Sequence, residues 1–198
     1  MKKIAPILAI FSTIFFWGSS FPVMSFILET SSPLILGAGR FSLAALISLL
    51  WCIYSYNKKI RLDHYFRYFI AGFVGIFLYN LFLNYGQQNV SAGASSFIVN
   101  CNPLFTVLIG FLILKQKVSF IHWSCVFFCL IGIYIISLDQ EGGLEFGSGS
   151  TLILFAAILT AIYFHILKPL VLIYGAITSA AYTILFGTLP MIIWFPET

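Results

Sequence analysis

The sequence consists largely of apolar runs that are each about 20 residues long and are separated by short polar segments. A helix needs about 20 apolar residues to cross roughly 30 Å of hydrocarbon. A water-soluble domain is excluded, because 61% of the 198 residues are hydrophobic and only 8% are charged, against about 25% charged in a typical soluble domain. The runs predict an all-α polytopic membrane protein with about seven transmembrane helices. The predicted spans are 4–28, 33–56, 66–86, 91–114, 119–138, 149–167 and 176–195.

The charged residues are distributed asymmetrically around these spans. With a cytoplasmic N-terminus and alternating spans, nine of the ten basic residues fall on the cytoplasmic side and five of the six acidic residues on the outer side. The positive-inside rule describes this asymmetry, so we predict an integral membrane protein with a cytoplasmic N-terminus. The inner basic residues are Lys2, Lys3, Lys58, Lys59, Arg61, Arg67, Lys115, Lys117 and Lys168, and the outer acidic residues are Glu29, Asp139, Glu141, Glu145 and Glu197.

Arg40 is the only charged residue in the interior of a predicted span, since Arg67 lies at the cytoplasmic edge of the span 66–86. An arginine at mid-bilayer costs roughly 2.5–3.5 kcal/mol on insertion scales, so it is a functional candidate by default. Arg40 lies seven residues past Pro33, which places it about 10 Å below the outer boundary of its helix. At this depth its guanidinium either faces a substrate path or gate, or reaches outward to a structural partner.

Asparagines supply most of the other candidate polar groups. Asn80 and Asn84 share one face of the third span, where a buried amide needs a partner worth about 0.5–2 kcal/mol. They either join neighbouring helices or line a polar cavity. Asn100 and Asn102 of the fourth span are about 200° apart on a helical wheel, so they cannot both face one cavity.

Two further candidates are a proline and a tryptophan. Pro103 lacks an amide hydrogen, so a kink there frees a backbone acceptor near residue 99. The result is either part of a solute path or a kinked packing helix. Trp17 lies in mid-span beside Gly18 and Ser19, and it is either a packing aromatic or a gate.

The sequence predicts no cofactor, no metal and no enzymatic activity. Its four cysteines lie within apolar runs and lack the spacing of a zinc site, and no nucleotide-binding or nucleophile motif is present. The net charge of +4 does not indicate a nucleic-acid partner, because no basic cluster shares a soluble face with aromatic platforms.

Four motifs occur in a fixed order along the chain. Trp17-Gly18 lies in the first span, Arg40 follows Gly37 and Gly39 in the second, and Pro103 lies within the fourth. A tight connection, Tyr85-Gly86-Gln87-Gln88-Asn89-Val90-Ser91-Ala92-Gly93-Ala94-Ser95-Ser96, leads into that fourth span. This ordered set resembles the EamA-type repeat of the drug/metabolite transporter superfamily, over residues 4–138. One departure is Lys115-Gln116-Lys117, where the family often has Gly-Glu-Arg.

The resemblance implies ten helices in two five-helix repeats, the second inverted relative to the first, as alternating access requires. Residues 1–138 then form the first repeat, and residues 139–198 form two helices of a partial second repeat whose last three helices are absent. We therefore expect either a homo-oligomer or a partner that supplies the missing helices.

The resemblance further implies a transporter of small organic metabolites, an exporter working by alternating access in a bacterial inner membrane. Its expected partners are the lipid bilayer and a small-molecule solute. Because no carboxylate lies in a predicted span, a facilitator or exchanger is favoured over a proton symporter. The alternatives are a non-transporting scaffold or accessory subunit, a truncated inactive fragment, or, least favoured, an intramembrane enzyme. The candidate path residues are Trp17, Arg40, Asn80, Asn84, Asn100, Asn102 and Pro103.

Overall fold

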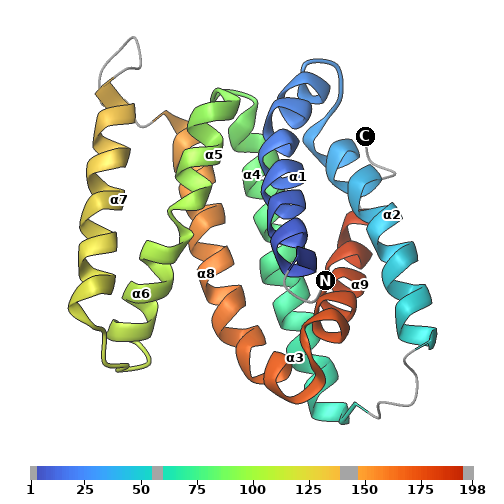
Figure 1. Cartoon of the computed structure of the whole chain (residues 1–198). Coiled ribbons are helices and arrows are strands. Elements are labelled where there is room, and N and C mark those ends of the chain that lie inside the picture. Colours follow the sequence, from blue (N-terminus) through green and yellow to red (C-terminus); the bar gives the residue numbers. More distant parts are fainter. Residues whose placement is uncertain (1–3, 55–59, 139–146, 194–198) are drawn as a thin grey trace.

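The computed structural model describes residues 4–54, 60–138 and 147–193, and these residues form a bundle of helices (Figure 1). No strand occurs among them, so the predicted all-α polytopic class is confirmed. The first predicted span corresponds to α1 (Ile4–Leu28) and the second to α2 (Pro33–Tyr54). The backbone amides of Thr30 and Ser31 both donate to the Ile27 carbonyl, which closes the turn between these helices.

The third span is one continuous helical rod with a change of helix type in its middle. It consists of α3 (Leu62–Gly72), the π-helix η1 (Phe73–Leu78) and α4 (Tyr79–Gln87). It begins at Leu62, four residues before the predicted start at residue 66. The polar residues directly after Arg61 thus belong to the helix and not to the preceding connection. Asp63 therefore lies in the first turn of this rod, at its exposed end.

The fourth span is broken in its middle. Helix α5 (Ala92–Asn100) ends at Cys101, and α6 (Asn102–Leu112) begins directly after it with Pro103 in its first turn. Cys101 has φ −77° and ψ 2°, which interrupts the helical hydrogen-bond ladder. The break falls where the missing amide hydrogen of Pro103 predicts a kink.

The last three helices are α7 (Phe120–Leu138), α8 (Ser148–Tyr174) and α9 (Ala176–Ile193). The predicted end of the sixth span at residue 167 was wrong, because α8 continues through Lys168 and Pro169. Its last turns are held by burial of Leu170 and Tyr174. Gly175, with φ 86°, then ends the helix in a conformation that favours glycine.

Six of the helical rods are long and apolar enough to cross a membrane, among the residues that the structure describes. These six are the rods that contain α1, α2, α3–α4, α5–α6, α8 and α9. The fifth predicted span, 119–138, coincides with α7, which contributes a shorter apolar segment at 120–132.

Helix α8 lies at the centre of the bundle and contacts α3, η1, α4, α5, α6 and α9 (Figure 1). Close approach depends on glycines. A Cβ on Gly86 of α4 would lie 2.6 Å from the Gly149 carbonyl of α8, and one on Gly72 would lie 2.7 Å from the Gly187 amide nitrogen of α9. Small residues allow such contacts between membrane helices.

Two clusters of buried side chains occupy opposite ends of the bundle. The first joins α1, α4, α5 and α8 around Phe21, Leu83 and Ile153. The second joins α3 and α8 around Tyr68, Leu170 and Tyr174. Along α8 the buried members of the first cluster reach Ala156 and those of the second begin at Leu167, and Thr160 and Phe164 between them line a cavity.

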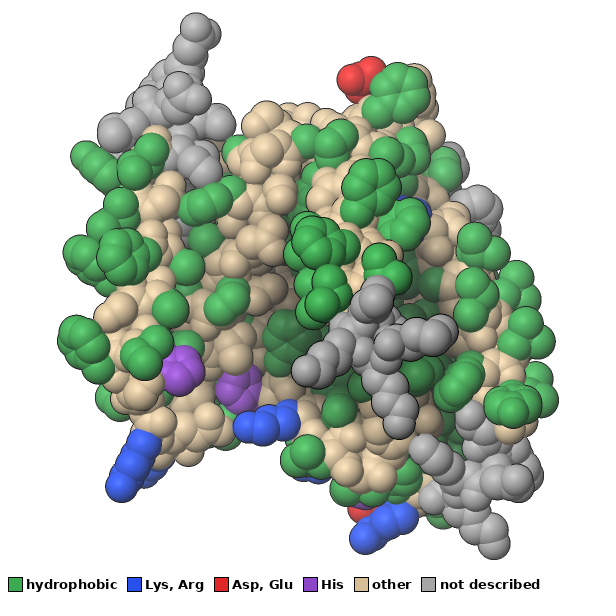
Figure 2. All heavy atoms as spheres, viewed as in Figure 1, with side chains coloured by type: hydrophobic (Ala, Val, Ile, Leu, Met, Phe, Trp, Pro, Cys, Tyr) green, Lys and Arg blue, Asp and Glu red, His purple; other side chains and the backbone are tan. Residues whose placement is uncertain are grey.

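Basic side chains gather at one end of the bundle, where α3 begins and α6 joins α7 (Figures 1 and 2). An acidic side chain lies at the opposite end in Figure 2. The described basic residues, apart from Arg40, are Arg61, Arg67, Lys115, Lys117 and Lys168. The described acidic residues are Glu29 and Asp63. The remaining charges in the topology prediction lie outside the described residues: Lys2, Lys3, Lys58, Lys59, Asp139, Glu141, Glu145 and Glu197.

Candidate functional site

A cavity of about 310 Å³ lies between the two core clusters, where α1, α2, the η1–α4 junction, α8 and α9 meet. It is lined mainly by aromatic and aliphatic side chains, with a few polar groups among them. Of the seven candidate path residues, Trp17, Arg40 and Asn80 line it. The other lining residues include Met24, Phe41, Tyr79, Thr160, Tyr163 and Phe164. We call it the central cavity.

Arg40 brings the only formal charge to the lining of the central cavity. Its guanidinium contacts the Met24 sulfur and lies 6.0 Å from the centre of the Phe41 ring. The ion pairs in the described part of the chain all involve Asp63, and none includes Arg40. Arg40 is therefore a positive charge held by a sulfur and an aromatic face, without a carboxylate partner among the described residues.

The π-helix η1 shapes one wall of the cavity. Wider helical turns of this kind are rare and often occur at functional sites. Asn80, only 2% exposed, donates from Nδ2 to the Ile76 carbonyl over 2.7 Å. Within η1, Gly75 lies so close to the Tyr163 ring that a Cβ would be 2.2 Å from it. Tyr163 thus covers bare backbone, and its hydroxyl lies 3.5 Å from the Thr183 hydroxyl.

Asn84 lies outside the central cavity and ties two helices together. Its Nδ2 donates to the Pro33 carbonyl of α2 over 3.1 Å, and the residue is 1% exposed. One turn further on, Gln87 donates to the Phe21 carbonyl of α1 over 2.7 Å. The side-chain oxygens of both amides are buried without a hydrogen-bond partner among the described residues. The geometry of Asn84 matches the helix-joining alternative, and Gln87 is a second tie that the sequence interpretation missed.

Asn100, Asn102 and Pro103 lie at the break between α5 and α6, away from the central cavity. The exposed Asn100 donates from Nδ2 to the Ser96 carbonyl of its own helix over 2.8 Å. The Asn102 carbonyl accepts the Thr106 hydroxyl over 2.9 Å. The structure therefore divides the seven candidates into three that share one cavity and four that do not.

The sequence interpretation also missed Thr160 and Tyr163 of α8. They lie three residues apart on one face of an apolar helix, and both line the central cavity. Polar groups spaced by one helical turn were a usable signal. Their neighbours across the cavity come from α1, α2 and η1, and no local pattern identifies such long-range partners.

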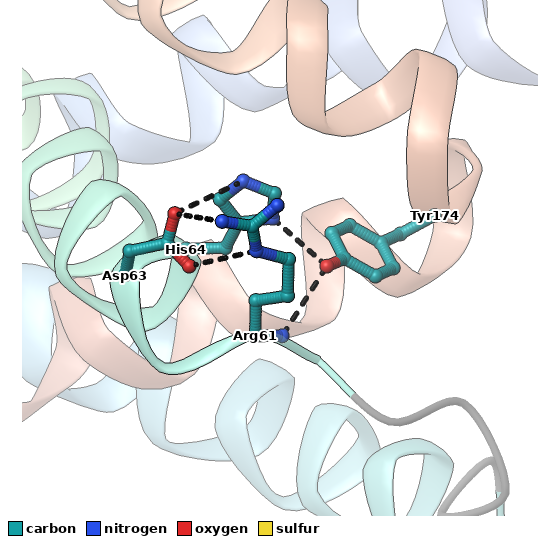
Figure 3. Close-up of polar contacts among 4 residues, drawn as sticks. All are labelled: Arg61, Asp63, His64 and Tyr174. Atoms are coloured by element: carbon teal, nitrogen blue, oxygen red, sulfur yellow. Dashed lines mark hydrogen bonds and ion pairs between the residues drawn. The ribbon is translucent and has the colours of Figure 1, made fainter.

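A polar cluster at the basic end of the bundle fastens the start of α3 to the end of α8 (Figure 3). Arg61 Nε and Asp63 Oδ1 are 3.1 Å apart. His64 lies between Asp63, 3.7 Å from Nε2, and the Tyr174 hydroxyl, 2.8 Å from Nδ1. The Arg61 backbone amide also donates to the Tyr174 hydroxyl over 3.3 Å. These contacts satisfy one another, so the cluster is a structural fastening.

The described segments offer no set of side chains that could bind a metal ion. They contain no group of three or more His, Cys, Asp or Glu side chains that could hold a metal ion. Cys52, Cys101, Cys125 and Cys129 are free thiols.

Comparison with known proteins places the chain among transporters. A model of the EamA-like transporter family matches residues 4–138. An uncharacterized transporter, YdfC of Bacillus subtilis, is 30% identical, with 91% of this chain and 59% of the relative covered. An uncharacterized transporter of Archaeoglobus fulgidus is 24% identical, with 94% and 66% covered. A probable terminal-alkyne amino-acid exporter of Streptantibioticus cattleyicolor is 23% identical, with 95% and 63% covered. No solved structure matches the chain. The chain spans about three-fifths to two-thirds of the length of these relatives.

Proposed function

Because the chain belongs to the EamA-like transporter family, we propose that it carries a small organic metabolite across a membrane. The observation that carries this proposal is the central cavity of about 310 Å³ between α1, α2, η1 and α8. Sites for small molecules are concave, mostly apolar, and contain a few polar groups that fix the ligand's orientation. The central cavity has this composition, with Arg40 and Asn80 among aromatic and aliphatic side chains.

The chemistry of Arg40 supports a solute that carries a carboxylate. A charged group in a low-dielectric site is stabilised by an opposite charge, and a guanidinium binds a carboxylate through two parallel hydrogen bonds. Arg40 lacks such a partner among the described residues. An anionic or zwitterionic metabolite, such as an amino acid, would supply it. The relative named as a probable amino-acid exporter agrees with this class and with outward transport.

We propose alternating access without proton coupling as the mode of transport. None of the lining residues of the central cavity is an Asp or Glu, and membrane proton relays commonly use these residues. This lining supports a facilitator or an exchanger, in which binding of the solute itself accompanies the change between the two open states. The solute would enter from one end of the bundle, bind beside Arg40 and leave at the other end.

The expected location is a bacterial inner membrane with a cytoplasmic N-terminus. Its support is the gathering of Arg61, Arg67, Lys115, Lys117 and Lys168 at one end of the bundle, which would be the cytoplasmic end. The first half of α1 is exposed on all sides over residues 6–18, with Phe11, Phe15 and Phe16 each at least 68% exposed. Lipid, a second copy of the chain or a partner that supplies further helices would cover this surface.

Counterflow of a labelled amino acid into liposomes tests the proposal. We expect accumulation with the wild-type protein and a loss of about tenfold or more in the Arg40→Ala variant, because a charge-assisted contact is lost. Arg40→Lys should retain part of the activity. Arg67→Ala is the matched control, since it removes an equal charge at the basic end and should transport like wild type.

Two outcomes would contradict the proposal. Wild-type counterflow in the correctly inserted Arg40→Ala protein would remove Arg40 from the site. Absence of counterflow for every amino acid and organic anion tested, combined with co-purification of a stoichiometric membrane partner, would instead favour the scaffold or accessory-subunit alternative.

A further inference from the structure

A second cavity, of about 250 Å³, lies at the basic end of the bundle between α6, its connection to α7, the start of α7 and α8. Its polar lining comes from four separate segments, and none of these polar residues lines the central cavity. We call it the basic pocket. Its polar side chains are Thr106, Gln116, Lys117, His122, His165 and Lys168.

The connection between α6 and α7 folds back to form one side of the basic pocket. Lys115 adopts a left-handed conformation with φ 51°. The Gln116 amide consequently donates back to the Gly110 carbonyl over 2.9 Å, and the Leu114 amide donates to the Ile109 carbonyl over 3.2 Å. This arrangement caps the end of α6. It holds Gln116 against Gly110 of α6 instead of leaving it in an extended loop.

Gly110 allows two polar side chains to meet at the floor of the basic pocket. A Cβ on Gly110 would lie 3.2 Å from the Gln116 Oε1 and 3.5 Å from the His165 Nε2. Groups from the connection and from α8 thus converge on the same point of α6. Gln116 and His165 therefore meet on α6 at Gly110, and Lys117, His122 and Lys168 surround them as exposed side chains.

The charges in the basic pocket are all of one sign. Lys117 and Lys168 contribute two ammonium groups, and neither forms an ion pair in the described part of the chain. The His165 Nδ1 donates to the Ala161 carbonyl over 2.9 Å, and the His122 Nδ1 lies 2.6 Å from the Ser119 hydroxyl. Each ring is thereby oriented through Nδ1, and the Nε2 of a neutral His165 is then an acceptor. Two ammonium groups repel a metal ion and attract an anion, so the lysines make the pocket suit an anion.

The surroundings of the basic pocket indicate the depth at which it lies. Trp123, next to His122 in sequence, packs edge-on against Phe111, and tryptophans are enriched where a membrane meets water. Ile113, Phe120 and Ile121, which flank the connection between α6 and α7 in sequence, are each at least 71% exposed. Figure 2 shows histidine and basic side chains close together near the basic end of this face, with hydrophobic side chains above them.

We propose that the basic pocket binds a phosphate group, the chemistry shared by anionic phospholipid headgroups and phosphorylated solutes. Basic pockets between membrane helices on the cytoplasmic side bind such groups. Lys117 and Lys168 supply the charge, and the side-chain amide nitrogen of Gln116 supplies a neutral donor. The apolar rim provides a surface for acyl chains beside the headgroup. The proposal does not depend on what the central cavity transports.

The test measures binding to the purified full chain in detergent micelles, with two probes in separate arms. One probe is phosphatidylglycerol, with phosphatidylcholine as the lipid of zero net charge, and the other is inorganic phosphate, with chloride at equal ionic strength. For the probe that binds, we expect the Lys117→Gln and Lys168→Gln variants each to bind about fivefold more weakly than wild type. The Lys117→Arg variant, which keeps the charge, should bind like wild type. Lys115→Gln is the matched control, because Lys115 lies in the same connection but does not line the pocket.

Each outcome decides the proposal. Lysine-dependent binding of phosphatidylglycerol alone assigns a lipid headgroup, and lysine-dependent binding of inorganic phosphate assigns a free phosphate group. The proposal is overturned if neither probe binds, or if the Lys117→Gln and Lys168→Gln proteins bind as tightly as Lys115→Gln. The single variants change an exposed connection and an exposed position on α8, so folding is preserved and each can be measured separately.

Discussion

The central cavity and the basic pocket are similar in volume, about 310 and 250 Å³, and both include Phe164 of α8 in their lining. They differ in how charge is placed. The central cavity holds one guanidinium among aromatic and aliphatic side chains, whereas the basic pocket holds two ammonium groups at the charged end of the bundle. Electrostatic interactions are strong in the first setting and weakened by water and salt in the second. We therefore expect one contact, at Arg40, to supply most of the binding free energy in the central cavity. In the basic pocket we expect several weaker contacts to contribute similar amounts.

The largest expected contrast comes from matched glycine substitutions in the two walls. Gly75→Ala places a Cβ 2.2 Å from the Tyr163 ring, and overpacking of this kind costs about 1–3 kcal/mol. Gly110→Ala meets the flexible end of Gln116 at 3.2 Å, and alanine is the better helix former by about 1 kcal/mol. We expect a lower unfolding midpoint for Gly75→Ala, measured by thermal unfolding in micelles, and little change for Gly110→Ala. Equal midpoints would show that Tyr163 is not packed tightly on η1.

Apolar periodicity and length were sufficient to place the spans, because the bilayer imposes both. They could not reveal η1, since nothing in residues 73–78 distinguishes a π-helix from an α-helix by composition. They also ended α8 too early, because Lys168 and Pro169 resemble a boundary. The burial of Leu170 and Tyr174 against α3, which carries the helix onward, is a long-range effect.

The candidate site was only partly predictable for a related reason. Rarity of charge identified Arg40, and helical spacing paired Asn80 with Asn84. Spacing alone could not show that Asn80 lines the cavity while Asn84 bonds to Pro33. The basic pocket depends on the left-handed turn at Lys115 and on contacts with α8. The division into a first repeat and a partial inverted repeat stays a prediction.

Substitution of a buried amide tests whether hydrogen bonds between helices outside the central cavity contribute to the stability of the bundle. Asn84→Leu leaves the Pro33 carbonyl without its donor, and we expect a loss of about 0.5–2 kcal/mol in unfolding free energy. Asn100→Leu is the matched control, because the exposed Asn100 bonds only within its own helix and its loss should cost less than about 0.5 kcal/mol. Denaturant titration in micelles gives both values. A reversed order would place the important amide at the α5–α6 break.

Salt should separate the two cavities in binding experiments. Raising monovalent salt from about 0.1 M to about 1 M shortens the Debye length from about 10 Å to about 3 Å. We expect phosphate-group binding in the basic pocket to weaken by about fivefold, because its lysines face the aqueous interface. Arg40 is itself exposed, but the apolar lining of the central cavity would enclose its pair with a bound solute. Solute affinity should therefore change by less than about twofold, since an enclosed pair is screened less. Equal salt dependence would show that the central cavity is open to bulk electrolyte.

The smallest expected effect is that of removing one hydroxyl from the central cavity. The Tyr163 hydroxyl lies 3.5 Å from the Thr183 hydroxyl, which itself contacts the Ser179 and Ala180 carbonyls at 3.0 and 2.9 Å. Tyr163→Phe therefore removes a long contact whose partner stays satisfied, and stability should fall by less than about 0.5 kcal/mol. Counterflow should also stay within about twofold of wild type if Arg40 alone anchors the solute. A tenfold loss of counterflow with unchanged unfolding would mean that the hydroxyl bonds directly to the solute, so that two polar groups hold it instead of one.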